Sequence, residues 1–427
     1  MRTEASRQYQ IKGTTAKGFE SVKRLYERNM NTLEEKGTQL CVYYNDKKVI
    51  DLWASKDEDF SPDSLVNVFS SGKSLETIAM ASLVGEELLN YDDRITDYWS
   101  EFGQNGKQWL TVAELMRHEA GLAAFDCSLA TEDLLTENLK RNKIGSIIER
   151  QAQKYRPNAE SKREYHPLTR GWIINEVFRR IEPNGRTIGE FLRDEIGTPL
   201  GVDAFVGMKQ HELERRAHVI PLNLKFFLRE SLKPQILGRR TELNFFQLIA
   251  KLIQIVPAFR RSTRRNGPAP FFKMRGIGFF NEPSVAMGET PSANAHSNAR
   301  SLAKIAAMMA AGGQLENKEY LTPSAWSALH DKPEKARMGI GTSTFTQGGV
   351  ALFTPCSKGS NLEKAFNRGR EGFYGWMGLG GSIFQWHPEH RIGFGYVPTS
   401  LNILDFFNER GKSYQNEVLN CVKRLKS

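Results

Sequence analysis

Cysteine and histidine are scarce in this sequence of 427 residues, which contains four and eight of them. The cysteines lie far apart and form no CxxC pair, which argues against a disulfide framework and against a zinc cage. His296, His387 and His390 do not show metal-ligand spacing with any cluster of carboxylates. We therefore predict no metal ion and no other cofactor.

Long apolar runs are also missing. The longest runs fall well short of the roughly 20 residues that cross a bilayer, so no transmembrane helix is expected. The first residues, MRTEASRQYQIKGTTAKGF, contain no apolar core and no small-residue cleavage pattern of the kind found in secretory signals. The expected location is the cytoplasm, with mitochondria as the alternative.

Positive charge is abundant, but it is concentrated in one segment. The net charge is +10, and residues 221–275 hold twelve Lys and Arg against two acidic residues, Glu230 and Glu242. This basic insert therefore accounts for the whole excess, and the rest of the chain is neutral. No nucleic-acid-binding motif accompanies the charge, so a nucleic-acid partner is not predicted.

The basic insert also contains apolar residues at helical spacing, and three interpretations remain open. The spacing is carried by Leu248, Ile249, Leu252, Ile253 and Val256. The segment is a lid over a substrate cleft, a helix that makes a peripheral contact with an anionic membrane, or a pair of core helices followed by a solvated basic loop. The sequence does not choose among them.

The order of the expected elements predicts the fold class. Apolar spacing indicates a helix over residues 19–26, then a hairpin of strands Gln39–Tyr44 and Lys48–Trp53, then a helix over residues 71–89. Further helices are marked by their capping residues or by an alanine-rich pattern: Thr111 with Glu114, Thr187 with Glu190 and an end at Gly197 and Pro199, residues 298–311, and Thr322 with Pro323. The last part contains three strands and a terminal helix from about Asn402: Gly341–Phe345, Gly381–Trp386 and Ile392–Val397.

These elements indicate an α+β fold, an α/β sandwich. We expect a mainly antiparallel sheet built from both chain ends and flanked by terminal helices, with an inserted all-helical domain and the active site between the two. The predicted sheet domain comprises residues 1–95 and 335–427. The predicted helical domain comprises residues 96–334 and includes the basic insert.

The polar cluster at residues 69–74 admits two chemical interpretations. A phosphate-binding loop needs a glycine five residues before Gly72, where this sequence has Asn67. A Ser-x-x-Lys motif instead places Ser70 and Lys73 on one helical face, so that the amine can take the serine proton if its pKa is lowered. A polar helix start with a surface lysine would give the same four letters.

Three segments in the same order resemble the first half of class C β-lactamases, family VIII carboxylesterases and related penicillin-binding and metazoan β-lactamase-domain proteins. They are Phe69-Ser70-Ser71-Gly72-Lys73, then LVGEEL at residues 83–88, then Leu110 to Leu122 with its HEAGL ending. The family has LVxEGxL and HTSGL at the last two places. The resemblance implies that Ser70 is the nucleophile and Lys73 its base, and that His118 is structural.

Two further motifs depart from the pattern of that family. Tyr165-His166-Pro167 stands where the family has Tyr-x-Asn, which implies that Tyr165 is a partner base although the Asn is absent. Trp376-Met377-Gly378 stands in place of Lys-Thr-Gly, so the lysine that binds a substrate carboxylate is missing. The resemblance further implies an oxyanion hole formed by the amides of Ser70 and Leu379, with Gly378 and Gly380 keeping the backbone close to the substrate. A tight turn before a strand would also explain these glycines.

The expected function is that of a serine hydrolase that forms an acyl-enzyme on a small-molecule ester, amide or peptide substrate. The two altered motifs favour an esterase or peptidase over antibiotic hydrolysis. The alternative is a catalytically inactive relative that uses the same cleft as a binding or scaffold protein. The sequence gives no oligomeric state.

Overall fold

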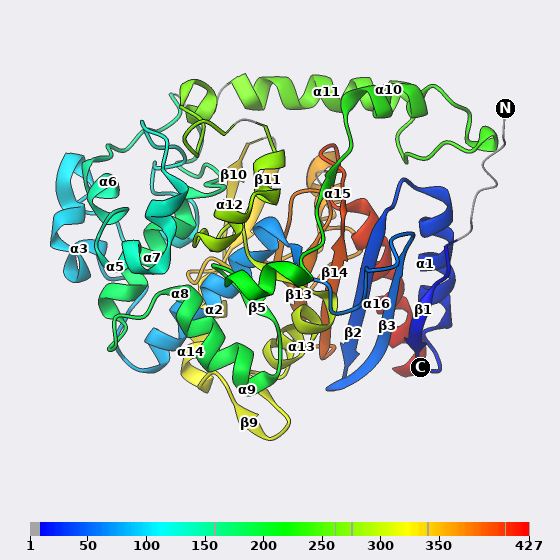
Figure 1. Cartoon of the computed structure of the whole chain (residues 1–427), viewed down its shortest axis with the longest axis horizontal. Coiled ribbons are helices and arrows are strands. Elements are labelled where there is room, and N and C mark those ends of the chain that lie inside the picture. The colour runs from blue at the N-terminus through cyan, green and yellow to red at the C-terminus, as the bar shows by residue number, and fades with distance from the viewer. Residues whose placement is uncertain are drawn as a thin grey trace.

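The computed structural model describes residues 9–157, 159–260, 262–274, 276–339, 341–405 and 407–426, without the side chains of residues 254–259 and 266. Its main sheet has six antiparallel strands in the order β1-β3-β2-β14-β13-β12 (Figure 1). The first three come from the start of the chain and the others from its end: β1 (Lys12–Thr15), β2 (Gly37–Tyr44), β3 (Lys47–Ser55), β12 (Tyr374–Met377), β13 (Ile383–His387) and β14 (Ile392–Pro398). Because β2 pairs with β14, the predicted sheet from both chain ends is confirmed.

Helices cover both faces of this sheet. Alternate residues of a strand point to opposite faces, and in β2 Leu40 and Val42 lie in one hydrophobic cluster while Cys41 lies in another. The first face packs against α1 (Glu20–Thr32) and α16 (Glu409–Lys426), and the second against α13 (Ala299–Ala310) (Figure 1). The expected flanking of the sheet by terminal helices is therefore confirmed.

In the described chain, thirteen further helices lie between β3 and β12: α10, α11 and α15 are given below, and most of the other ten gather on the left of the molecule in Figure 1. They are α2 (Lys73–Gly85), α3 (Ile95–Tyr98), α4 (Val112–Met116), α5 (Thr136–Lys140), α6 (Gly145–Arg150), α7 (Thr169–Ile181), α8 (Ile188–Phe191), α9 (Thr198–Leu200), α12 (Pro283–Met287) and α14 (Pro323–His330). The capping boxes at Thr111 and Thr187 and the cap of α14 at Thr322 are present, as predicted, and Asn298 caps α13. The sequence therefore predicted the capping residues at these helix starts.

Small elements complete the described chain. They are β4 (Val66–Asn67), β5 (Ala204–Phe205), β6 (Ile220–Pro221), β7 (His296–Ser297), β8 (Gln314–Leu315), β9 (Lys318–Glu319), β10 (Glu334–Met338), β11 (Gly341–Phe345), β15 (Ser400–Leu401) and α15 (Asn361–Asn367). The expected strand at residues 341–345 is β11, but it pairs with β10 in a separate two-stranded sheet.

Several predicted helix boundaries were wrong. The helix that follows Ser70 covers Lys73–Gly85 instead of residues 71–89, and Glu87, with a φ of 59°, turns the backbone into the left-handed region. The terminal helix begins at Glu409 because Asn408, with a φ of 51°, precedes it in the same conformation. The helix from Thr187 does not end at Gly197, since the backbone continues through a π-helical turn into α9.

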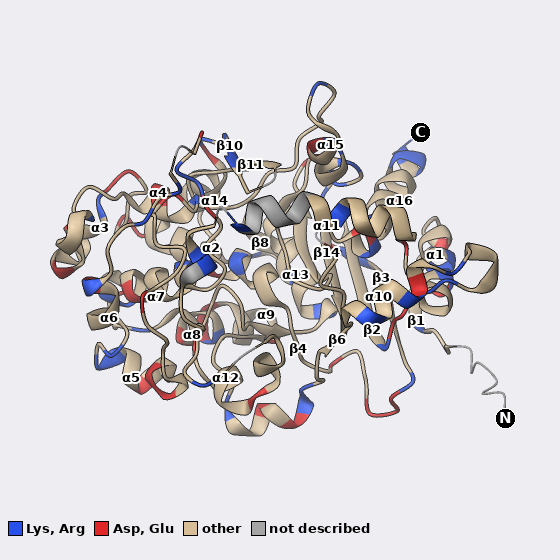
Figure 2. Cartoon of the chain, turned by 90° about the horizontal axis from the view of Figure 1, so that it is seen from above, with Lys and Arg blue, Asp and Glu red and all other residues tan. Residues whose placement is uncertain are grey.

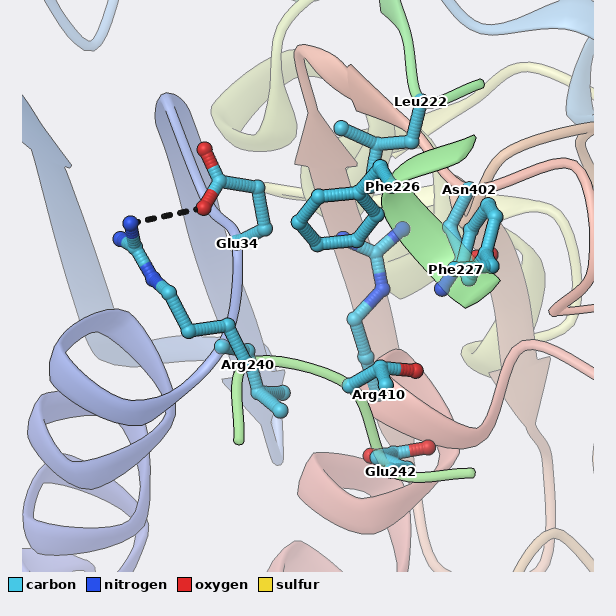
Figure 3. A pocket seen from close by; sticks show the side chains of 10 residues that line it. Glu34, Leu222, Phe226, Phe227, Arg240, Glu242, Asn402 and Arg410 are labelled. Carbon is cyan, nitrogen blue, oxygen red and sulfur yellow. Dashed lines mark ion pairs between the residues drawn. The ribbon is translucent and has the colours of Figure 1, made fainter. Parts of the chain in front are cut away.

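The basic insert forms α10 (Leu224–Ser231) and α11 (Phe245–Arg260), which lie along one outer side of the molecule (Figure 1). Its inner side packs through a small cluster of Leu222, Phe227, Leu248 and Leu404. Figure 3 shows a pocket at this junction, where the Arg240 guanidinium of the insert forms an ion pair with Glu34 at 2.9 Å. Among the described residues, no helix has the length and hydropathy needed to cross a membrane.

Candidate active site

Ser70 lies in a short 3₁₀ turn, Phe69–Gly72, between β4 and α2. The preceding Phe69 has a φ of 48°, an uncommon conformation for a bulky residue, and its amide donates to Asn67 Oδ1 at 2.7 Å. Ser70 is partly exposed while its neighbours Phe69 and Ser71 are buried. The strained turn therefore holds the partly exposed Ser70 at a fixed place, as strained backbone does at many functional sites.

Lys73, the first residue of α2, is buried with 2% of its surface exposed. Its Nζ donates to the carbonyl oxygens of Pro167 at 2.8 Å and Ser292 at 2.9 Å. Burial lowers the pKa of Lys73 well below its ordinary value, and Arg170 and Arg264 lower it further, against the opposing effect of Glu76. A neutral amine has two N–H groups and one lone pair. The two carbonyls accept both N–H groups, so the lone pair is left to accept a proton.

Glu76 and Arg170 form a fully buried ion pair behind Lys73. Arg170 Nε donates to Glu76 Oε1 at 2.7 Å, and Ser292 Oγ donates to Glu76 Oε2 at 2.9 Å. Arg170 also donates to the Met116 carbonyl at 2.8 Å. This network fixes Ser292, whose carbonyl binds Lys73. The sequence analysis missed these residues, although two opposite charges inside apolar helix patterns were a signal that could have revealed them.

Tyr165 lies beside Ser70 and Lys73. Its ring centre is 5.0 Å from Lys73 Nζ, and its Oη accepts a hydrogen bond from Trp376 Nε1 at 3.0 Å. Burial raises the pKa of Tyr165, whereas its interactions with the side chains of Ser70 and Trp376 oppose that rise. The structure therefore brings together Ser70, Lys73 and Tyr165, which come from positions far apart in the sequence.

Trp376 on β12 closes one side of the site. Its backbone amide donates to Ser74 Oγ at 3.1 Å, which ties β12 to α2. Its ring packs against Phe345 at 5.2 Å and Phe366 at 6.1 Å between ring centres. At the position where the family has a cationic lysine, this chain therefore has an aromatic wall.

The segment after β12 is fastened to the turn that carries Ser70. Ser382 Oγ donates to the Val68 carbonyl at 2.6 Å and lies 3.1 Å from Ser71 Oγ. Asn408 Nδ2 donates to the Gly378 carbonyl at 3.0 Å. A Cβ atom at Gly378 would collide with Ser382 Oγ and the Val68 carbonyl, so only glycine permits this approach. Leu379 follows directly, with 36% of its surface exposed, and Gly380 has a φ of 82°.

Two buried histidines hold the loop of Tyr165. The His166 amide donates to His118 Nδ1 at 3.1 Å, and His166 Nε2 accepts from the Leu122 amide at 3.1 Å. Burial lowers the pKa of His166 to about 3, so its ring is neutral at physiological pH. Glu164 completes the loop by accepting hydrogen bonds from Ser262 Oγ at 2.7 Å and from the Thr263 amide at 3.0 Å. These last two donors belong to the basic insert.

Comparisons with known proteins agree with this arrangement. The curated protein Esterase/beta-lactamase LipL of Mycobacterium tuberculosis (strain ATCC 25618 / H37Rv) is 25% identical over 381 residues, which cover 86% of this chain and 77% of that protein. A penicillin-binding protein homolog from Caulobacter crescentus has a TM-score of 0.75 and 25% identity, covering 96% of this chain and all of that one. A family VIII carboxylesterase, at 22% identity, shares the fold with a TM-score of 0.74 over 96% of this chain and all of that one.

The family model described as Beta-lactamase matches residues 22–413, which include every segment of the site. The resemblance inferred from the motifs at Ser70, residues 83–88 and residues 110–122 is confirmed, as is the α+β fold. This chain belongs to the beta-lactamase family, and its relatives identify it as a serine hydrolase.

Proposed function

We propose that Ser70 attacks an ester or amide carbonyl and forms an acyl-enzyme. The neutral amine of Lys73 accepts the hydroxyl proton while the serine oxygen bonds to the carbonyl carbon. The proton passes through Tyr165 to the leaving alcohol or amine as the bond to that group breaks. A water molecule then adds to the acyl carbon, and Ser70 regains its proton as the carboxylic acid leaves.

The amides of Ser70 and Leu379 stabilise the negative charge of the tetrahedral intermediate in this proposal. The contacts of Ser382 with Val68 and Ser71 support it, because they hold the segment of Leu379 against the turn of Ser70. Gly378 and Gly380, which have no side chain, let the backbone come close to the substrate. Donors held in place before the reaction lower the barrier without reorganising during it.

The substrate class follows from the aromatic wall. Trp376, Phe345 and Phe366 offer apolar contact where a lysine would bind a carboxylate. We therefore propose small esters with an uncharged acyl chain as the preferred substrates, ahead of amides, peptides and β-lactam antibiotics. A relative of this chain carries the name esterase, which agrees with that preference.

The observation that carries the proposal is the buried Lys73, donating to two carbonyls beside Ser70 and Tyr165. A lysine whose pKa is lowered by burial, placed beside a partly exposed serine and a tyrosine, is typical of a catalytic site. The arrangement therefore favours catalysis over the binding or scaffold alternative.

Turnover of 4-nitrophenyl butyrate tests this function. Wild-type protein should hydrolyse the ester, and Ser70→Ala and Lys73→Ala should each lose at least about a thousandfold in kcat/KM. The exposed residues Ser357 and Lys358 provide matched controls, and Ser357→Ala and Lys358→Ala should keep full activity. Folded wild-type protein that hydrolyses neither this ester nor longer acyl esters, amides or a cephalosporin would support the binding alternative.

A further inference from the structure

Large apolar side chains are exposed on the outer side of the basic insert. Ile236 is 92% exposed, Phe246 82% and Ile253 66%. Leu224, Leu232, Leu237 and Phe272 in the same segment are also exposed. Monomeric proteins seldom leave so many large apolar groups together in water, and such patches mark surfaces that meet another phase or a partner.

On α11 the exposed apolar residues lie on one face of the helix. Phe246, Ile249 and Ile253 are spaced at i, i+3 and i+7, which places them on one face of the helix. All three are exposed, whereas Leu248 on the other side is fully buried against the body of the molecule. The prediction of core helices therefore applies to only one side of α11. The burial of Val256 lies outside the described residues.

The charge of the insert is positive around this apolar face. Exposed basic residues include Lys225 on α10, Arg265 after α11 and Lys273 beyond it, and none of the three forms an ion pair within the described part of the chain. Glu230 is buried and paired with Arg229 and Lys233, so it does not offset them. In Figure 2, where the ribbon is blue at Lys and Arg, blue positions lie on both α10 and α11.

We propose that α10, α11 and their flanking loops form a docking surface for an anionic lipid bilayer. An amphipathic helix with exposed Phe and Ile and neighbouring Lys and Arg lies flat in the interface, its apolar side chains among the acyl chains and its cations beside the anionic headgroups. The charge of the insert favours this occupant over a second copy of the chain, because two copies would bring two strongly basic segments together.

Docking would also place the catalytic site at the lipid surface. The insert continues from α11 into Ser262 and Thr263, which bind Glu164, the residue before Tyr165. The surface that meets lipid and the loop that carries Tyr165 are thus linked by one short segment. If the proposed function holds, the enzyme draws apolar esters from the membrane, which suits the aromatic wall at Trp376.

Vesicle flotation of the full chain tests the docking surface without any use of catalysis. Wild-type protein should float with vesicles of phosphatidylcholine containing about one third phosphatidylserine and much less with phosphatidylcholine alone. The triple variant Phe246→Ser, Ile249→Gln, Ile253→Gln should lose at least about tenfold of the bound fraction. The matched control replaces exposed apolar residues outside the insert, Trp109→Ser with Leu425→Gln, and should float as wild type does.

Charge reversal tests the proposed contact between the basic residues of the insert and the anionic headgroups. Lys225→Glu with Arg265→Glu should also reduce flotation about tenfold, whereas Lys358→Glu with Arg368→Glu, at exposed positions outside the insert, should not. All variants should hydrolyse a water-soluble ester at the wild-type rate if the proposed function is correct, so failure of the function and failure of docking are separate results.

Two results would overturn the proposal. The first is equal flotation of the wild-type protein with anionic and neutral vesicles, or flotation of the triple variant with anionic vesicles that equals that of wild type. The second is a wild-type dimer, seen by light scattering, that the triple variant dissociates while neither protein floats. That result would assign the apolar face to a second copy of the chain.

Discussion

Among the single residues, Lys73 is the one whose protonation state controls the chemistry that we propose. Its pKa is lowered chiefly because α2, the Pro167 loop and Ser292 enclose it. The neutral amine is the form that accepts the Ser70 proton, and it predominates only above the pKa of Lys73. The rate should therefore fall as the pH decreases through that lowered pKa, and it should not fall as the pH rises from neutrality toward the ordinary lysine range.

This dependence can be measured as kcat/KM for a neutral ester across the pH range in which the protein stays folded. Lys73→Arg should lose at least about a thousandfold at every pH, because a guanidinium remains protonated. A wild-type profile without an acidic limb, or an arginine variant with substantial activity, would show that Lys73 is not the base.

Tyr165 allows a finer test of proton transfer. Tyr165→Phe keeps the packing against Lys73 but removes the Oη, so kcat should fall about a hundredfold or more. Trp376→Phe removes the hydrogen bond to that Oη and reduces the ring that packs against Phe345 and Phe366, but it keeps the phenol and should lower kcat much less than Tyr165→Phe. Equal losses in both variants, with unchanged melting temperatures, would mean that the phenol serves only to order the site.

The residues that we propose to act on the substrate were easier to find in the sequence than those that support them. Ser70 and Lys73 are three positions apart, and Tyr165 and Trp376 follow in the order typical of the family, so local motifs sufficed. Ser292 acts through its backbone carbonyl, which every residue possesses, and no sequence pattern marks such a role. The roles of Ser70, Lys73, Tyr165, Leu379 and the two glycines stay predictions until they are tested.

At the level of secondary-structure elements, the joint between β12 and the turn of Ser70 determines whether the site is assembled. Gly378→Ala should reduce kcat about a hundredfold or more, because the new Cβ collides with the Val68 carbonyl and pushes the Leu379 amide away from Ser70. The control is Gly278→Ala, since a Cβ at Gly278 meets no other atom within 4 Å. Steady-state kinetics on both variants measures the loss of kcat, and circular dichroism verifies that both are folded. Full activity of Gly378→Ala would remove Leu379 from the proposed oxyanion hole.

Helix starts marked by a capping side chain were predictable, but the other helix boundaries were less so. Helix starts carry side-chain signals, as at Thr111 and Thr187, because a hydroxyl there satisfies exposed backbone N–H groups. The end of α2 at Gly85 and the start of α16 at Glu409 depend on the left-handed residues Glu87 and Asn408, whose side chains do not dictate that conformation. The π-helical turn before Gly197 had no visible signal either.

For the molecule as a whole, the two chain ends are locked together by a buried ion pair. Arg410 at the start of α16 lies 2.6 Å from Glu35, just before β2, and both are almost fully buried. Arg410→Met should lower the free energy of unfolding by about 3–5 kcal/mol, because it leaves the Glu35 charge buried without a cationic partner. Chemical denaturation measures this change.

The matched control is the exposed pair of Arg337 and Glu160, whose atoms are 3.0 Å apart. Arg337→Met should change the free energy of unfolding by only about 0–1 kcal/mol. Equal effects of the two substitutions would contradict the view that the Arg410 pair joins the chain ends.

The global arrangement followed from the sequence because strand patterns at both chain ends, with helices between them, favour one common sheet, although β11 pairs separately with β10. The domain boundaries at residues 95 and 334 and the cytoplasmic location stay predictions. The placement of the basic insert could not be derived, because its apolar stripe is equally compatible with a core and with an exposed face. Only the packing of Leu248 inward and of Phe246 outward distinguishes the two.

The central claim is that Ser70 forms a covalent acyl-enzyme, and mass spectrometry tests it most directly. After brief incubation with a fluorophosphonate, intact wild-type protein should gain the mass of one adduct, and peptide mapping should place it on Ser70. Ser70→Ala should gain none, whereas Ser71→Ala, which keeps the hydroxyl of Ser70, should still be labelled. Folded wild-type protein that remains unmodified, or an adduct that persists in Ser70→Ala, would contradict the account.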